Sequence, residues 1–235
     1  MSTAGRLKRD ERHRQGLADL WAQVSQRTAR QGADLAHDLP HLRRVWNNAS
    51  LLAARAAEDE GWTIDLDVLE AAVALHDIGR GQEQDGERSE VTSAAIAEDM
   101  LRHHGLGDLV WPVCEAILSH SWSADREAST AEARILQDAD RLDALGAIGV
   151  ARALLMGSSM ATPELYCEDD PYAEKRDLDD HAYIMDHFPA KLFRLAEQMV
   201  TPFGRAEGER RTRIVRAFYE ALLRDAGVAR GDGQP

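Results

Sequence analysis

The stretch Ala72-Val73-Ala74-Leu75-His76-Asp77-Ile78-Gly79-Arg80-Gly81 joins an apolar helical run to an adjacent imidazole and carboxylate. A helix that buries its residues up to Leu75 has no packing use for the next two side chains. Burying both is costly unless something pairs with them, and a divalent cation does this well. The stretch also fits an ordinary helix C-terminus, with His76 at the negative end of the helix dipole and Gly79 as a left-handed cap. Ligands elsewhere in the chain decide between the two interpretations.

The composition is that of an ordinary globular protein. Of 235 residues, 44% are hydrophobic and 29% are charged, so the chain is long enough to bury a core. No apolar run approaches the ~18 residues of a membrane span, and the charged residues 1–14 lack the apolar segment of a secretory signal. Cys114 and Cys167 form neither a disulfide framework nor a zinc-ligand pair. These features predict no membrane association and a cytoplasmic location.

The formal net charge of −13 at pH 7 limits the classes of partner. So acidic a chain is unsuited to following the phosphates of a long nucleic acid. A small phosphorylated molecule is still compatible with it, because a metal site and a few local arginines can hold a phosphate. The sequence favours no particular oligomeric state.

Apolar spacing predicts helices along nearly the whole chain. Alanine and leucine recur at helical intervals, whereas strand-like alternation of β-branched residues is scarce. The expected helices cover about residues 15–30, 40–60, 66–77, 90–104, 108–120, 130–155, 175–200 and 206–226. Asp38 and Asp65 are expected to cap the second and third, and Ser129-Thr130-Ala131-Glu132 reads as a capping box for the sixth. The fold class is therefore all-α.

No internal repeat, low-complexity linker or convincing domain boundary interrupts the chain. We therefore predict a single helical domain over residues 15–228. Residues 1–14 are expected to be disordered or loosely held, and residues 229–235 to form a disordered tail.

A second unusual carboxylate, Asp140, lies in the expected helix over residues 130–155. Apolar residues surround this helix, which predicts a central place in the core, and Asp140 shares a face with Leu136 and Asp143. An isolated buried carboxylate is strongly disfavoured, so Asp140 should meet a cation. That cation is either a metal ion or an arginine, Arg141 or one on a neighbouring helix.

The order of His41, then His76-Asp77, then Asp140 resembles the HD superfamily of metal-dependent phosphohydrolases, which is named for the central doublet. The flanking words are similar as well: His41-Leu-Arg-Arg-Val-Trp, Leu75-His-Asp-Ile-Gly and Gln137-Asp-Ala-Asp-Arg-Leu-Asp-Ala-Leu-Gly. Segments beginning at His187 and Met199 look like the C-terminal part of a bacterial subgroup of uncharacterised and nucleotide-hydrolysing HD proteins. The resemblance covers about residues 30–225 and implies an HD-domain helical bundle like that of the cyclic-nucleotide phosphodiesterases.

The resemblance also implies a metal centre, with the ligands His41, His76, Asp77 and Asp140. Two nitrogens and two carboxylate oxygens suit Mn²⁺, Mg²⁺, Ni²⁺, Zn²⁺ or Fe²⁺ with positions open for water and substrate. Some members of the superfamily bind a second metal through further histidines. His120 resembles one such position, but the other reads Ser89-Glu90 here. We therefore expect one metal ion per chain.

Basic residues near the doublet are candidates for binding the substrate. Arg80 resembles the basic residue that often follows the doublet, and we expect it to contact a phosphate and to assist catalysis beside Asp77. Arg44, one turn after His41, and Lys191 are further substrate-binding candidates. For Arg44 and Lys191 a solvated or ion-paired cation is an equally good interpretation.

The general acid or base is less distinct. Asp143 shares a helix face with Asp140, and we expect it to orient a ligand or a water molecule. Glu83 and Glu87 lie in the polar loop after the doublet, where other HD nucleotide hydrolases carry acidic helpers.

The activity implied by the resemblance is hydrolysis of a phosphate ester or phosphoanhydride bond in a nucleotide or small phosphorylated metabolite by metal-activated water. One alternative is an iron-dependent oxygenase on the same scaffold, which would need two irons and more histidines. The other is a non-catalytic metal-binding sensor module, although all four ligands are present.

Overall fold

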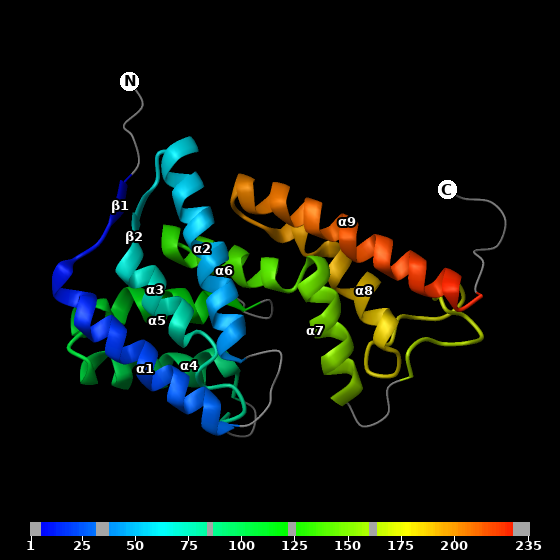
Figure 1. Cartoon of the computed structure of the whole chain (residues 1–235), viewed down its shortest axis with the longest axis horizontal. Helices are drawn as coiled ribbons and strands as arrows, with labels where there is room; N and C mark the ends of the chain where they lie inside the picture. Colours follow the sequence, from blue (N-terminus) through cyan, green and yellow to red (C-terminus); the bar gives the residue numbers. More distant parts are fainter. Residues whose placement is uncertain (1–5, 32–37, 84–86, 122–125, 160–163, 228–235) are drawn as a thin grey trace. The chain divides into compact units, whose positions relative to one another are not determined.

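The computed structural model describes residues 6–31, 38–83, 87–121, 126–159 and 164–227, and they are largely helical, as predicted (Figure 1). Contacts between residues group the chain into two compact units, residues 1–140 and residues 141–235. The single domain over residues 15–228 stays a prediction, and the tail at 229–235 lies outside the described residues. In the part of the chain that is described, no helix combines the length and apolarity that crossing a membrane requires.

The first unit is built from helices with one small pair of strands. Strand β1 (Arg6–Lys8) runs parallel to β2 (Thr63–Asp65). The helices are α1 (Arg14–Gln31), α2 (Leu39–Asp59), α3 (Leu66–Leu75), α4 (Ser89–His103), α5 (Val110–His120) and the beginning of α6 (Ala131–Asp143), with 3-10 turns η1 (Glu11–His13) and η2 (Gly107–Leu109).

Helix α3 is the centre of the first unit. It contacts α1, α2, α4 and α5, and every residue from Asp67 to Leu75 except Glu70 is buried. The Asp65 side chain caps it, as predicted, by accepting hydrogen bonds from the amides of Asp67 and Val68. A helix that is apolar on nearly all sides must be surrounded by the protein. Its last turn therefore brings His76 and Asp77 into the interior.

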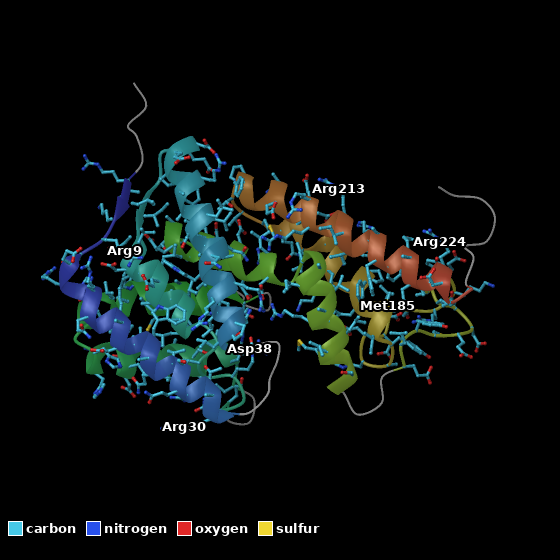
Figure 2. The ribbon with its side chains drawn as sticks, in the orientation of Figure 1. Arg9, Arg30, Asp38, Met185, Arg213 and Arg224 are labelled. Carbon is cyan, nitrogen blue, oxygen red and sulfur yellow. The ribbon has the colours of Figure 1, made fainter. Side chains whose placement is uncertain are left out.

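The second unit contains the helices α7 (Gly146–Ser159) and α9 (Pro202–Asp225) and a run of short helical turns. The turns are η3 (Ile184–Asp186), α8 (His187–Ala190), η4 (Leu192–Arg194) and η5 (Ala196–Gln198). Helix α9, drawn orange to red in Figure 1, contacts α7 and the turns α8, η4 and η5. The buried Phe188 stacks on Phe218 of α9, and Met185, labelled in Figure 2, is fully buried.

The predicted helix over residues 130–155 is wrong in its middle, because it is two helices. Helix α6 ends at Asp143 and α7 begins at Gly146. Gly146 has a φ of 71°, a left-handed conformation that favours glycine and ends a helix. The capping box also differs by one residue, since the Thr130 hydroxyl accepts from the Ala133 amide at 3.1 Å. Glu132 instead accepts from the Asp65 amide at 2.7 Å and so ties α6 to α3.

The predicted helix over residues 175–200 is also wrong. Asp179 accepts hydrogen bonds from the amides of His181 and Ala182, both at 3.1 Å. The Asp186 carboxylate accepts from the Asp179 amide at 2.7 Å. Aspartate side chains that bond nearby amides in this way compete with helical hydrogen bonds. The segment therefore forms short turns, whereas the predicted last helix is confirmed as α9.

Residues 6–13, expected to be loosely held, are fixed to the first unit. Beyond the strand pairing, the buried Asp67 accepts from Arg9 Nη1 at 3.1 Å, from the Asp10 amide at 2.7 Å and from His13 Nδ1 at 3.0 Å. His13 Nε2 lies 3.1 Å from Asp108 Oδ2. Figure 2 labels Arg9 in this segment. Apolar spacing could not predict this attachment, because it is made by ionic contacts. The partners Asp67 and Asp108 also lie far along the chain from residues 6–13.

His13 should make stability depend on pH. Burial acts against its protonation, but the hydrogen bonds to Asp67 and Asp108 outweigh this and raise the pKa of His13. A raised pKa in the folded state means that the stabilisation is complete below the unfolded value of about 6.5 and is lost as pH rises through the folded value. We expect His13→Ala to destabilise the protein by about 1–3 kcal/mol at pH 6 and by less at pH 9. Urea unfolding at both pH values measures this, with the exposed His103→Ala as control; an equal loss at both would contradict it.

Candidate metal centre

Helix α2 fixes the position of His41. The Asp38 carboxylate caps the helix by accepting from the His41 amide at 2.9 Å, and Figure 2 labels Asp38 at this helix start. Pro40 fits the first turn, where its missing N–H leaves no bond unmade. The imidazole that follows is completely buried. The capping predicted from the sequence is therefore confirmed, and it holds His41 at the beginning of a rigid helix.

The doublet lies where α3 gives way to a series of tight turns. Ile78, Arg80 and Gln82 each donate an amide hydrogen bond to the carbonyl three residues earlier, at 3.0 to 3.1 Å. His76 Nδ1 lies 2.9 Å from the Val73 carbonyl, which only accepts, so Nδ1 carries a proton. In the neutral ring Nε2 is then left with its lone pair, and this is the form that binds a metal.

Gly79 brings this turn against helix α4. Its amide donates to the buried Ser93 hydroxyl at 3.0 Å. A Cβ atom at Gly79 would lie 2.5 Å from the backbone nitrogen of Ser93, closer than real Cβ atoms come. Gly79 does not have the left-handed φ that a helix cap would give it; in the described part of this turn that conformation belongs to Gly81. Close approach to α4 is therefore the reason for a glycine at position 79.

Helix α6 presents Asp140 from the other side of the cluster. Two side-chain amides hold this helix: Asn48 of α2 donates to the Ala139 carbonyl, and Gln137 donates to the Ser119 carbonyl, both at 3.1 Å. Burial acts to raise the pKa of Asp140, but the neighbouring His76 and His41 rings lower it below its usual range. The carboxylate is therefore charged.

The four expected ligands come together. The Nε2 atoms of His41 and His76 lie 3.3 Å apart. Asp77 Oδ2 lies 3.8 Å from the first of these nitrogens and 3.5 Å from the second. Asp140 Oδ1 lies 3.6 Å from the first and 3.8 Å from the second. Ligand atoms about 2.1 Å from a common tetrahedral ion stand about 3.4 Å apart. These separations are compatible with a divalent ion, and His41, His76 and Asp77 form one group of possible ligands whose donor atoms lie within 4.8 Å of one another.

His120 lies next to this cluster. With His76 and Asp140 it forms a second group of possible ligands, whose donor atoms lie within 4.8 Å of one another. Its Nδ1 donates to the Ile117 carbonyl at 2.6 Å. Burial lowers the pKa of His120, and the adjacent His76 lowers it further, which keeps the ring neutral. Glu90, at the position where a further histidine was sought, is buried and paired with Arg88. One metal ion per chain stays a prediction.

Two of the residues expected to bind the substrate, Arg80 and Arg44, lie in the same unit as the proposed metal ligands. Arg80 extends from the doublet turn, with Nε 3.6 Å from Asp77 Oδ1 and 43% of its side chain exposed. Arg44 is half-buried on α2, one turn beyond His41. Both belong to the first unit, and their contact with a substrate stays a prediction.

Asp143 and Lys191 belong to the second unit. Asp143 is buried and accepts from Arg152 Nη1 at 2.7 Å, so it already has an ionic partner. Lys191 ends α8, where its amide donates to the His187 carbonyl at 3.0 Å. Their expected roles in catalysis and substrate binding stay predictions.

Comparison with known proteins bears on the identity of the cluster. The family model described as HD domain matches residues 35–145, a span that contains His41, His76, Asp77 and Asp140. The uncharacterized protein YpgQ of Bacillus subtilis is 30% identical over 194 residues, which cover 80% of this chain and 84% of that protein. The chain belongs to the HD-domain family. That His41, His76, Asp77 and Asp140 are the metal ligands of this HD domain stays a prediction.

Solved structures agree with this HD-domain fold. The crystal structure of B. subtilis YpgQ in complex with ADP has a TM-score of 0.67 and 24% identity, over 89% of this chain and 94% of that one. A predicted HD superfamily hydrolase from an uncultured Thermotogales bacterium has a TM-score of 0.57 and 25% identity, over 94% and 95%. The chain is therefore a metal-dependent hydrolase of the HD-domain family.

Sequence reasoning missed two residues that position the expected ligands. Asn48, which holds the backbone beside Asp140, lies seven residues after His41 and so faces the same side of α2. That spacing is a usable signal. Ser93 supports the doublet turn from α4, and nothing in its local sequence distinguishes it from other serines.

Proposed function

We propose that this HD-domain chain is a phosphohydrolase that cleaves a phosphate ester or phosphoanhydride bond of a nucleotide or another small phosphorylated metabolite. The observation that carries the proposal is the cluster itself, in which two buried imidazoles and two carboxylates converge beside an exposed arginine. Oxygen and nitrogen donors in this number suit Mn²⁺, Mg²⁺, Ni²⁺, Zn²⁺ or Fe²⁺.

A related protein supports a nucleotide substrate. The related YpgQ has been crystallised with ADP, and the present chain is 30% identical to that protein. The net charge of −13 disfavours a long nucleic acid but not a mononucleotide held locally.

The side chains have separable tasks in such a reaction. A divalent ion held by His41, His76, Asp77 and Asp140 would polarise a phosphoryl oxygen and lower the pKa of a bound water toward ~7. The Val73 carbonyl keeps the His76 ring in its ligand orientation. Arg80, next to Asp77 but partly exposed, offers N–H donors to the charge that develops on the transferred phosphoryl group.

The test is hydrolysis of a panel of nucleoside mono-, di- and triphosphates, each with Mn²⁺, Mg²⁺, Ni²⁺, Zn²⁺ or Fe²⁺, with separate detection of phosphate and pyrophosphate. We expect turnover of at least one nucleotide that stops on chelation and returns with the metal. Two irons per chain with oxygen consumption and no phosphate release would identify an oxygenase instead. Bound metal with no turnover of any phosphate compound would identify a sensor module.

Replacing Arg80 should separate substrate binding from metal binding. Hydrogen bonds to charged groups contribute about 1.5–3 kcal/mol, so we expect Arg80→Ala to lower kcat/KM by about 10–100-fold. Because Arg80 supplies no metal ligand, metal content should not change. Arg80→Lys should recover part of the loss. Steady-state kinetics and metal analysis measure both effects, with Arg102→Ala on the exposed face of α4 as control. An Arg80→Ala enzyme with unchanged kcat/KM would remove Arg80 from the substrate site.

A further inference from the structure

The second unit contains a cavity of its own, remote in sequence from the HD ligands. It has a volume of about 210 Å³ and lies between α7 and the segment of residues 180–187. Pockets that hold a whole drug-sized ligand occupy about 300–1,000 Å³. This cavity is therefore large enough for a ring system and too small for a complete nucleotide.

One wall of the cavity is apolar. It is made by Ala153, Met156 and Gly157 of α7 together with Ile184. A Cβ atom on Gly157 would lie 2.6 Å from Ile184 Cγ1, so the glycine lets the two segments meet directly. The small Ala153 side chain leaves the space beside this contact open. Such a wall takes up an apolar ligand surface by excluding water from it.

The polar rim of the cavity consists of Asp180, His181 and His187. His187 Nδ1 lies 3.0 Å from Asp180 Oδ2. The hydrogen bond from His187 lowers the pKa of Asp180, against a smaller opposing effect of burial, so the carboxylate is charged and only accepts. His187 therefore holds a proton on Nδ1. The charged Asp180 carboxylate therefore gives the rim a hydrogen-bond acceptor for a ligand.

These properties select a class of ligand. A phosphate or carboxylate would meet the negative charge of Asp180. A full cation would compete with His187 Nδ1, which already donates to Asp180 Oδ2 at 3.0 Å. A neutral ligand with N–H donors at one edge and a flat apolar body satisfies both sides of the cavity.

We propose that this cavity is a binding site for an amino-substituted heterocycle, an aminopurine or aminopyrimidine ring. The amino edge donates hydrogen bonds to the Asp180–His187 pair, and the ring lies on the wall formed by α7. The inference uses only the residues of the second unit and does not depend on the hydrolytic activity proposed above.

Adenosine is a suitable probe because it has an exocyclic amino group and no phosphate. Purine riboside, which lacks only that amino group, is the matched ligand. The methionine methyl groups of the full chain are labelled with carbon-13, and each nucleoside is titrated into the protein. The NMR resonance of Met156 reports binding, and it is assigned by its absence in the Met156→Leu variant. Met100 of α4, in the first unit, serves as the internal reference.

The expected result is a saturable shift of the Met156 resonance with adenosine, at least tenfold weaker binding of purine riboside, and no shift at Met100. Ala153→Met should fill the cavity and weaken adenosine binding at least tenfold, whereas Ala151→Met on the exposed face of α7 should not. Asp180→Asn should reduce the preference for adenosine over purine riboside.

Three outcomes would each overturn the proposal. They are equal affinity for the two nucleosides, adenosine binding that Ala153→Met leaves unchanged, and no Met156 shift at millimolar adenosine. Because neither nucleoside contains a phosphate, these outcomes leave the phosphohydrolase test unaffected. Loss of hydrolysis with retained adenosine binding would in turn leave the cavity proposal standing.

Discussion

Asp140→Asn should abolish metal-dependent hydrolysis while leaving the protein folded. The substitution keeps the size of the side chain but replaces a charged oxygen, 3.6 and 3.8 Å from the two imidazole nitrogens, with a neutral amide. Changes in residues that only orient metal ligands cost about 10–100-fold in metal affinity or activity. Loss of a ligand itself should exceed this, so we expect at least about a 100-fold fall in activity. Nucleotide turnover measures the fall in activity, and circular dichroism checks that the protein is still folded. Metal content after dialysis measures the expected loss of the bound ion.

Asp99→Asn is the matched control for Asp140→Asn, since Asp99 is an exposed aspartate on α4 of the same unit. Added metal should raise the melting temperature of the control and of the wild type, because an ion that binds only the folded state stabilises it. It should not raise that of Asp140→Asn at the same concentration. An Asp140→Asn protein that keeps a full equivalent of metal and its turnover would remove Asp140 from the ligand set.

Gly79→Ala should destabilise the fold and weaken metal binding together. The added Cβ would lie 2.5 Å from the Ser93 nitrogen and 2.7 Å from the Thr92 carbonyl carbon. Both are backbone atoms of α4, so no side chain can turn aside to make room. Overpacking of this kind costs about 1–3 kcal/mol, and the shift it forces falls two residues from Asp77. Urea unfolding and metal titration measure the two effects.

Gly107→Ala is the control for Gly79→Ala. A Cβ at Gly107 meets no described atom within 4 Å, and Gly107 is not among the described glycines of positive φ. Its free energy of unfolding should change by no more than about 0.5 kcal/mol. Equal stabilities for the two variants would show that the turn and α4 can move apart at little cost. Close approach to α4 would then not explain why residue 79 is a glycine.

Helices α2 and α3 were predicted well because each has an identifiable cap. Their predicted bounds lie within two residues of the observed ones, and Asp38 and Asp65 cap them as expected. The predictions failed where a local effect opposes helical spacing. Gly146 divides α6 from α7 through its positive φ, and the Asp179 side chain bonds amides that a helix would use. Apolar periodicity contains no information on either effect.

The proposed metal ligands could be named from the sequence because such side chains are costly in a core without a partner. The His76-Asp77 doublet and Asp140 were both expected in the core, and the order of the proposed ligands resembles one superfamily. Supporting contacts such as Ser93 to Gly79 join segments that only the fold brings together. The attachment of residues 6–13 was missed for the same reason, since Asp67 lies more than 50 residues from its partners.

The wide spacing of the four ligands has a consequence for how the protein is made. A ribosome releases the chain from its N-terminus at about 5–20 residues per second, so α2 and α3 emerge with both imidazoles well before Asp140. The last ligand arrives only with α6, which Asn48 then holds through the Ala139 carbonyl. An ion that needs all four proposed ligands can therefore be fully coordinated only after α6 has left the ribosome.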